Sequence, residues 1–150
     1  MSDLEIRRAT AADVPALVAM LADDPLGAAR ETPDDIAPYE HAFARIDADP
    51  GQWLAVAERD GHVVGTLQLT LIPGLSRRGA TRALIEAVRV HRDERGSGLG
   101  TRLFEWAVEE ARRQGCAVVQ LTSDATRTDA HRFYERLGFA ASHVGFKRML

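Results

Sequence analysis

Cysteine is almost absent from the sequence: Cys116 is the only one in 150 residues. A single cysteine excludes an internal disulfide, which fits a reducing compartment, and we expect a cytoplasmic protein. Cys116 starts an apolar segment that directly follows a predicted helix end. We interpret it as a small buried hydrophobic residue rather than a nucleophile.

Long apolar runs, a signal-peptide pattern and excess positive charge are also missing. No run approaches the about 20 apolar residues of a membrane-spanning helix, and the first residues lack a basic-then-apolar leader. The net charge of −3 gives no overall attraction to nucleic acid. We expect no membrane and no nucleic-acid partner. Since His91, His131 and His143 show no metal-ligand spacing, we also expect no metal.

Hydrophobic patterning predicts one domain over residues 1–150. Alternation predicts strands over 4–9, 52–59, 62–72, 81–90, 117–122 and 139–148, and helical periodicity predicts helices over 11–21, 32–49, 98–114 and 129–137. Segments 23–31 and 73–79 are predicted loops. The strand–helix–strand crossover over 81–122 predicts a parallel pair. The fold class is therefore α/β (α+β): a mixed, mostly antiparallel sheet with a central parallel strand pair, flanked by helices.

Three alternate glycines, Gly96, Gly98 and Gly100, separate the 81–90 strand from the helix that follows. Glycine permits a positive φ and a close approach to the backbone, and free N–H groups at a helix start bind anions. A mononucleotide loop would need a lysine after the last glycine, and a dinucleotide loop needs different glycine spacing. A kinase loop joins antiparallel strands and does not precede a helix. These three phosphate-binding motifs are therefore excluded.

The segment that remains, Arg95-x-x-Gly98-x-Gly100, resembles the acyl-CoA loop of the GCN5-related N-acetyltransferases (the GNAT superfamily). A second segment, 130–139, reads A-H-R-F-Y-E-R-L-G-F and resembles that family's A-x-x-F-Y-x-x-x-G-F signature. The resemblance implies a GNAT-like domain that uses acetyl-CoA to acetylate a primary amine of a small molecule by direct attack in a ternary complex. The alternative is a non-catalytic, regulatory module that binds acyl-CoA.

The resemblance also implies which residues bind the cofactor. Backbone N–H groups would receive the pyrophosphate from Arg95, Gly96, Ser97, Gly98, Leu99, Gly100 and Thr101. Main-chain groups of Val88 and Val90 would run alongside the pantetheine arm, with the Val90 N–H polarising the thioester carbonyl. The alternative for Gly98 and Gly100 is plain crowding between helix and strand. Arg127 stands where relatives often have Asn, and it can meet a CoA phosphate or an acidic substrate group.

Two residues are expected to perform the chemistry. The resemblance places Tyr134 near the sulfur, where its phenol can protonate the departing thiolate. The alternative is that Phe133 and Tyr134 are both ordinary core aromatics. Glu86 is the candidate base, because strand alternation would put it on one face with Val88 and Val90, in an apolar run where burial would raise its pKa. The alternative for Glu86 is an ion pair with Arg82.

The acceptor is indicated only by charge. Arg77, Arg78 and Arg82 form a basic rim around the 73–79 loop, and we expect Arg82 to bind substrate. This rim favours an acceptor that carries a carboxylate or a phosphate beside its amine. A homodimer is left open.

Overall fold

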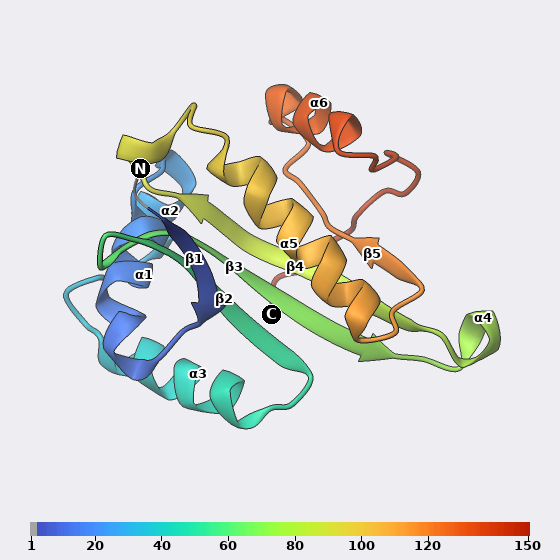
Figure 1. The fold of residues 1–150 in the computed structure, drawn as a ribbon, viewed down its shortest axis with the longest axis horizontal. Coiled ribbons are helices and arrows are strands. Elements are labelled where there is room, and N and C mark those ends of the chain that lie inside the picture. The colour runs from blue at the N-terminus through green and yellow to red at the C-terminus, as the bar shows by residue number, and fades with distance from the viewer. Residues whose placement is uncertain (1–2) are drawn as a thin grey trace.

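A computed structural model describes residues 3–150 of the chain (Figure 1). Its strands are β1 Leu4–Arg8, β2 Gln52–Arg59, β3 His62–Pro73, β4 Thr81–Val90 and β5 Val118–Gln120. Its α-helices are α1 Val14–Ala22, α2 Pro25–Arg30, α3 Ala37–Ala48, α4 Ser76–Gly79, α5 Leu99–Arg113 and α6 Thr128–Arg136. Two 3₁₀ turns, η1 Ala11–Asp13 and η2 Arg92–Glu94, precede α1 and α5.

The five strands form one mixed sheet in the order β1-β2-β3-β4-β5. The pairs β1–β2, β2–β3 and β3–β4 are antiparallel, and β4–β5 is parallel. This confirms the predicted fold class and the crossover through α5. Among the described residues the parallel pair lies at one end of the sheet and not at its centre, which corrects that detail.

Helices cover both faces of the sheet, as β2 shows most clearly. Its Ala55 and Ala57 belong to the larger core, which lies under α5 with Leu99 and Leu103. Val56, between them, points to the other face and packs with residues of α1 and with Phe43 of α3. Helix α6 adds to the α5 side, where its aromatic rings contact that helix (Figure 1).

The predicted β2–β3 hairpin is confirmed. Asp60 and Gly61 at its tip have φ of 53° and 78°. Two positive φ values in a two-residue loop are typical of the type I′ turn that Asp-Gly favours.

Two details near the N-terminus are wrong. The predicted loop 23–31 contains α2, which begins at Pro25 because the Asp24 side chain accepts a hydrogen bond from the Gly27 N–H. Helix α3 begins at Ala37 and not at residue 32, since Pro33 and Asp34 form a turn before it.

The predicted closing strand, 139–148, is also wrong: no regular element follows α6 among the described residues. Strand β5 is shorter than predicted, with residues 118–120 instead of 117–122. Alternation favours an extended conformation, but a strand also needs a neighbour to pair with. Within residues 3–150, no helix is long and apolar enough to span a bilayer.

Candidate active site

Strand β4 contains a bulge at Ala87. Thr66 lies opposite Arg89 and Gln68 lies opposite Glu86, so β4 has one more residue than β3 between these pairs. Ala87 has φ of 53°, in the left-handed region that costs a residue with a Cβ roughly 1–2 kcal/mol. No glycine or turn signal marks this position in the sequence.

The bulge reverses which face the later residues of β4 occupy. Before it, Ile85 pairs with Leu69, and both are buried in the core under α5. After it, Val90 pairs with Gly65, where a Cβ atom would lie 3.1 Å from Leu103 of α5. Val88 and Val90 therefore face α5.

Glu86, next to Ile85, points to the opposite face, so the prediction that it shares a face with Val88 and Val90 is wrong. Glu86 is also exposed and not buried as expected. The alternative expected for Glu86 is not observed either. Arg82 is exposed on the same face, and within residues 3–150 the two side chains form no ion pair.

Polar side chains line the sheet beside Glu86. The Gln68 Nε2 donates to Gln52 Oε1 at 2.8 Å, and the Thr70 Oγ1 donates to the same oxygen at 2.9 Å. Gln68 is the cross-strand neighbour of Glu86, and Thr70 is that of Leu84. The result is a half-exposed polar floor on β2 and β3, beside the carboxylate of Glu86.

The sequence analysis did not predict these polar residues as part of the site. Thr66, Gln68 and Thr70 alternate with Leu67 and Leu69, so the pattern T-L-Q-L-T carried the signal of a polar face. Thr66 is the buried member of this row, and its hydroxyl donates to the Ala55 carbonyl at 2.8 Å.

Beyond Leu84, one edge of β4 has no neighbouring strand among residues 3–150. Strand β5 pairs only with Arg82, Ala83 and Leu84. The His91 N–H donates to the Val64 carbonyl of β3 at 2.8 Å. Because successive N–H groups of a strand point to opposite edges, the N–H groups of Val90 and Val88 point to the unpaired edge. The Val88 carbonyl accepts a hydrogen bond from Arg89 Nη1 at 2.9 Å.

The glycine loop follows directly. Gly96 and Gly98 have φ of 82° and 86°, and a Cβ atom at either would meet no other atom within 4 Å. The missing side chain at these two glycines therefore permits a positive φ and is not needed for close packing between helix and strand. The crowding alternative for Gly98 is wrong. At Gly100 a Cβ atom would lie 3.6 Å from Phe133 and 3.9 Å from Val90, which are ordinary contacts. Crowding therefore does not require glycine at position 100 either.

Several N–H groups of the loop have no acceptor within residues 3–150. Those of Arg95, Ser97 and Leu99 donate to Arg92, Glu94 and the Ser97 hydroxyl. Those of Gly96, Gly98, Gly100 and Thr101 donate to no group of the described chain. Together with the dipole of the 15-residue helix α5, they can receive an anion.

Ion pairs hold the structure at both sides of this loop and strand. Glu94 of η2 contacts Arg59 of β2 at 3.0 Å, and Arg89 of β4 contacts Asp24 before α2 at 3.0 Å. Burial alone would raise the pKa of Asp24, but the hydrogen bond from Gly27 and the charge of Arg89 outweigh it and lower that pKa. Arg95 itself is exposed at the rim.

Tyr134 and Phe133 both pack against Phe104 of α5. Their ring centroids lie 5.5 Å and 5.6 Å from that of Phe104, in edge-to-face geometry. Both residues therefore contribute to packing, as the alternative for this pair expects. Both are half-buried, and the Tyr134 hydroxyl makes no hydrogen bond to any described residue.

Arg127 is the residue just before α6 and is exposed. Its backbone closes a turn, since its N–H donates to the Asp124 carbonyl at 3.0 Å. The pKa of Asp124 is lowered mainly by hydrogen bonds from Thr126, with a smaller contribution from the charge of Arg127. The guanidinium itself makes no hydrogen bond or ion pair within residues 3–150.

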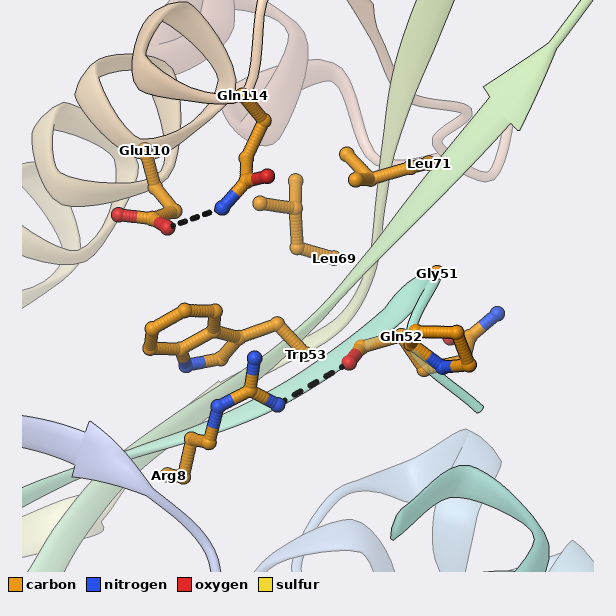
Figure 2. Close-up of a pocket in the computed structure, with 9 residues that line it drawn as sticks. Arg8, Gly51, Gln52, Trp53, Leu69, Leu71, Glu110 and Gln114 are labelled. Atoms are coloured by element: carbon orange, nitrogen blue, oxygen red, sulfur yellow. Dashed lines mark hydrogen bonds between the residues drawn. The ribbon is translucent and has the colours of Figure 1, made fainter. Parts of the chain in front are cut away.

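A small cavity lies away from the unpaired edge of β4, between β2 and the end of α5 (Figure 2). The Arg8 guanidinium stacks 3.8 Å from the Trp53 ring centroid, and Glu110 accepts from Gln114 at 3.0 Å (Figure 2). Its volume of about 20 Å³ holds roughly one water molecule, so it cannot receive a cofactor or an amine substrate. Among residues 3–150, no group of three His, Cys, Asp or Glu side chains could hold a metal ion.

Residues 15–139 match the family model for the acetyltransferase (GNAT) family. The chain belongs to the GNAT acetyltransferases. It is an N-acetyltransferase, and membership of this family implies the use of acetyl-CoA.

Relatives of this GNAT chain include two that act on phosphorus-containing amines. It is 32% identical to the aminoalkylphosphonate N-acetyltransferase of Salmonella typhimurium, over 97% of this chain and 91% of that one. It is 38% identical to the glucosamine 6-phosphate N-acetyltransferase of Trypanosoma brucei brucei, over 54% and 53%. The crystal structure of a transcriptional regulator from Bacillus halodurans C-125 superposes with a TM-score of 0.95 and 45% identity, over 99% and 100%.

Proposed function

We propose that the chain transfers the acetyl group of acetyl-CoA directly to the primary amine of a small molecule that also carries an anionic group. The observation that carries this proposal is a pair of opposite charges on β4: Glu86 and Arg82 are both exposed on one face and are not paired with each other. A substrate with an ammonium and an oxyanion would satisfy both.

Acetyl-CoA would bind at the glycine loop and along the unpaired edge of β4. The unpaired N–H groups of Gly96, Gly98, Gly100 and Thr101 would receive the pyrophosphate, with charge added at the rim by Arg95. The unpaired edge at Val88 and Val90 would pair with the pantetheine arm as an added strand does. The remaining loop residues, Ser97 and Leu99, would shape this cradle, and Arg127 would meet a CoA phosphate or an acidic group of the acceptor.

The chemistry would divide between two side chains. Glu86 would take a proton from the ammonium through water, and the freed amine would attack the thioester carbonyl, polarised by the Val90 N–H. As the C–N bond forms and the C–S bond breaks, Tyr134 would give its proton to the departing thiolate, and the proton that the nitrogen loses as it becomes an amide would pass through water to restore the Tyr134 hydroxyl. A free Tyr134 hydroxyl in a half-buried aromatic cluster supports this role.

The acceptor's anionic group would lie toward Arg82. Residues four apart on a strand are separated by about 13 Å, and the two side chains can reach toward each other over the Gln68–Thr70 floor. Relatives that act on an aminoalkylphosphonate and on glucosamine 6-phosphate both use amines with a phosphorus oxyanion. Arg77 and Arg78 lie further along, in the short helix α4, which replaces part of the predicted 73–79 loop, and can add long-range attraction.

A screen of amines with a free-thiol readout tests the proposal. It should include a short aminoalkylphosphonate and an alkylamine of the same chain length without the phosphonate. We expect the phosphonate to have the higher kcat/KM by about tenfold or more, the scale of one charge-assisted hydrogen bond. Equal values for the two would contradict the anionic acceptor.

A module that binds acyl-CoA without turnover, the alternative that the sequence left open, would release no thiol with any amine in this screen. A cytoplasmic location, expected from the single Cys116, completes the proposal.

A further inference from the structure

An ion pair joins the glycine loop to the end of the β2–β3 hairpin. Arg59 is the last residue of β2, where it pairs with His62 across the hairpin. Its Nε donates a hydrogen bond to Glu94 Oε1 at 3.0 Å, so the pair is both charged and hydrogen-bonded. The side chains are only 25% and 16% exposed, and a shielded pair is weakened less by salt than an exposed one.

Glu94 is the first residue of a tight turn within the loop. The Ser97 N–H donates to the Glu94 carbonyl at 3.1 Å, which closes a turn of four residues. Arg95 has φ −62° and ψ 134°, and Gly96 has φ 82°. These angles are typical of a type II β-turn, whose third residue needs a positive φ and favours glycine. The position of Glu94 therefore sets the direction in which the N–H groups of the following residues point.

The turn is attached to the sheet at two points. At the first, the Glu94 N–H donates to the His91 carbonyl at 2.9 Å, and the His91 N–H donates to the Val64 carbonyl of β3. At the second, the Glu94 side chain binds Arg59 of β2. Loss of the Arg59 guanidinium would leave the first attachment and remove the second.

The charge of Glu94 matters as much as the attachment. The N–H groups of Gly96 and Gly98 donate to no group of the described chain and would receive the pyrophosphate. The Cα atoms of Glu94 and Gly96 are at most about 7 Å apart, because one residue separates them. A carboxylate without a counter-charge at this distance would repel pyrophosphate, whereas a guanidinium in contact with that carboxylate cancels most of the repulsion.

We propose that Arg59 is a positioning residue for acetyl-CoA: it fixes the turn that begins at Glu94 and neutralises the Glu94 carboxylate beside the pyrophosphate site. The inference rests on the proposed function, because it takes the glycine loop as the site of the pyrophosphate. Arg59 lies 35 residues before Glu94 in the chain, outside both segments that resemble the family.

Calorimetry with acetyl-CoA on the full chain tests the proposal. Arg59→Gln should lower the affinity by about tenfold, because Glu94 then opposes the pyrophosphate, and Arg59→Lys should lower it less because the charge remains. Glu94→Gln should lose less affinity than Arg59→Gln, and the double variant should recover most of the loss. Arg113→Gln is the matched control: it also removes one positive charge and breaks an ion pair, to Glu110 near the other end of α5, and should bind acetyl-CoA as the parent does.

Acetylpantetheine, which has the thioester arm but no phosphate, provides a second measurement. Its kcat/KM with one fixed amine should be the same for Arg59→Gln and the parent, because the loop would bind only the phosphates. An equal loss with acetylpantetheine and acetyl-CoA would overturn the proposal, since the variant would then have damaged the site as a whole.

Two other results would also overturn it. One is a loss for Glu94→Gln as large as that for Arg59→Gln, since the ion pair would then act only as an attachment. The other is an acetyl-CoA affinity that Arg59→Gln leaves unchanged. In that case Gly98→Glu separates the two levels: if it lowers the affinity, only the role of Arg59 is wrong, and if it does not, the glycine loop is not the pyrophosphate site.

Discussion

The two sides of β4 are built in different ways. On the cofactor side, the candidate groups are main-chain atoms: the N–H groups of the glycine loop and the unpaired edge at Val88 and Val90. On the acceptor side they are side chains: Arg82, Glu86 and the floor of Gln52, Gln68 and Thr70. The bulge at Ala87 separates the two sides.

This difference has a functional consequence. Main-chain groups can be removed only by changing the backbone or by filling the space above it, and we propose that they bind acetyl-CoA, the cofactor that the GNAT family implies. Side chains can be exchanged one at a time without disturbing the fold, which suits a site that must select one amine. Substitutions on the cofactor side should therefore abolish binding, whereas those on the acceptor side should change selectivity.

The largest effect is expected at Gly98. Gly98→Glu puts a side chain and a negative charge where pyrophosphate would lie, and acetyl-CoA affinity should fall by about 100-fold or more. Because φ at this residue is 86°, the change also costs roughly 1–2 kcal/mol of backbone strain. Calorimetry measures the affinity, and thermal unfolding measures the strain.

Gly98→Asn is the matched control, since Asn tolerates a left-handed φ and adds no charge. It should bind acetyl-CoA far more tightly than Gly98→Glu. If folded Gly98→Glu bound acetyl-CoA as well as the parent, the assignment of the loop would be wrong.

Tyr134→Phe should have the next largest effect. The change keeps the ring that packs on Phe104 and removes only the hydroxyl. The melting temperature and the acetyl-CoA affinity should therefore stay the same. The value of kcat should fall by about 10- to 1000-fold, as for a lost general acid. An unchanged kcat, measured where chemistry limits turnover, would reduce Tyr134 to a packing residue.

Arg82→Gln tests the acceptor side alone. We expect KM for an anionic amine to rise by about tenfold, while KM for a neutral amine and for acetyl-CoA stays constant. Arg78→Gln, in the neighbouring helix α4, is the control and should have a smaller effect. An equal rise in KM for neutral and anionic amines would show that Arg82 does not bind the anionic group.

The smallest effect is expected at the bulge. Ala87→Gly removes the Cβ that a φ of 53° disfavours, and the melting temperature should rise by about 2–4 °C. Acetyl-CoA affinity should be unaffected, because glycine accepts the same backbone conformation. A fall in melting temperature would mean that Ala87 contributes packing which outweighs its strain.

The sequence predicted the conformation of the glycine loop better than the faces of β4, for a physical reason. Glycines at positions of positive φ and the regular apolar spacing of α5 leave direct marks in the sequence. A bulge at an alanine leaves none, and one extra residue turns every later side chain to the opposite face. The prediction that Glu86 shares a face with Val88 and Val90 failed for that reason.

The C-terminal segment shows a second limit. Alternating apolar residues in 143–150 predicted a strand, yet a strand forms only where a neighbouring edge accepts its hydrogen bonds. Within the described chain, no backbone hydrogen bond joins residues 143–150 to such an edge.

The central claim is that β4 keeps cofactor and acceptor chemistry on separate sides, with Glu86 serving the acceptor. Glu86→Gln tests it most directly, with kcat/KM for the amine measured across pH and acetyl-CoA affinity measured in parallel. We predict that kcat/KM near neutral pH falls by about 100-fold or more, recovers in part at high pH where free amine is abundant, and that acetyl-CoA affinity is unchanged. An unchanged rate at neutral pH, or a loss of acetyl-CoA affinity, would contradict the account.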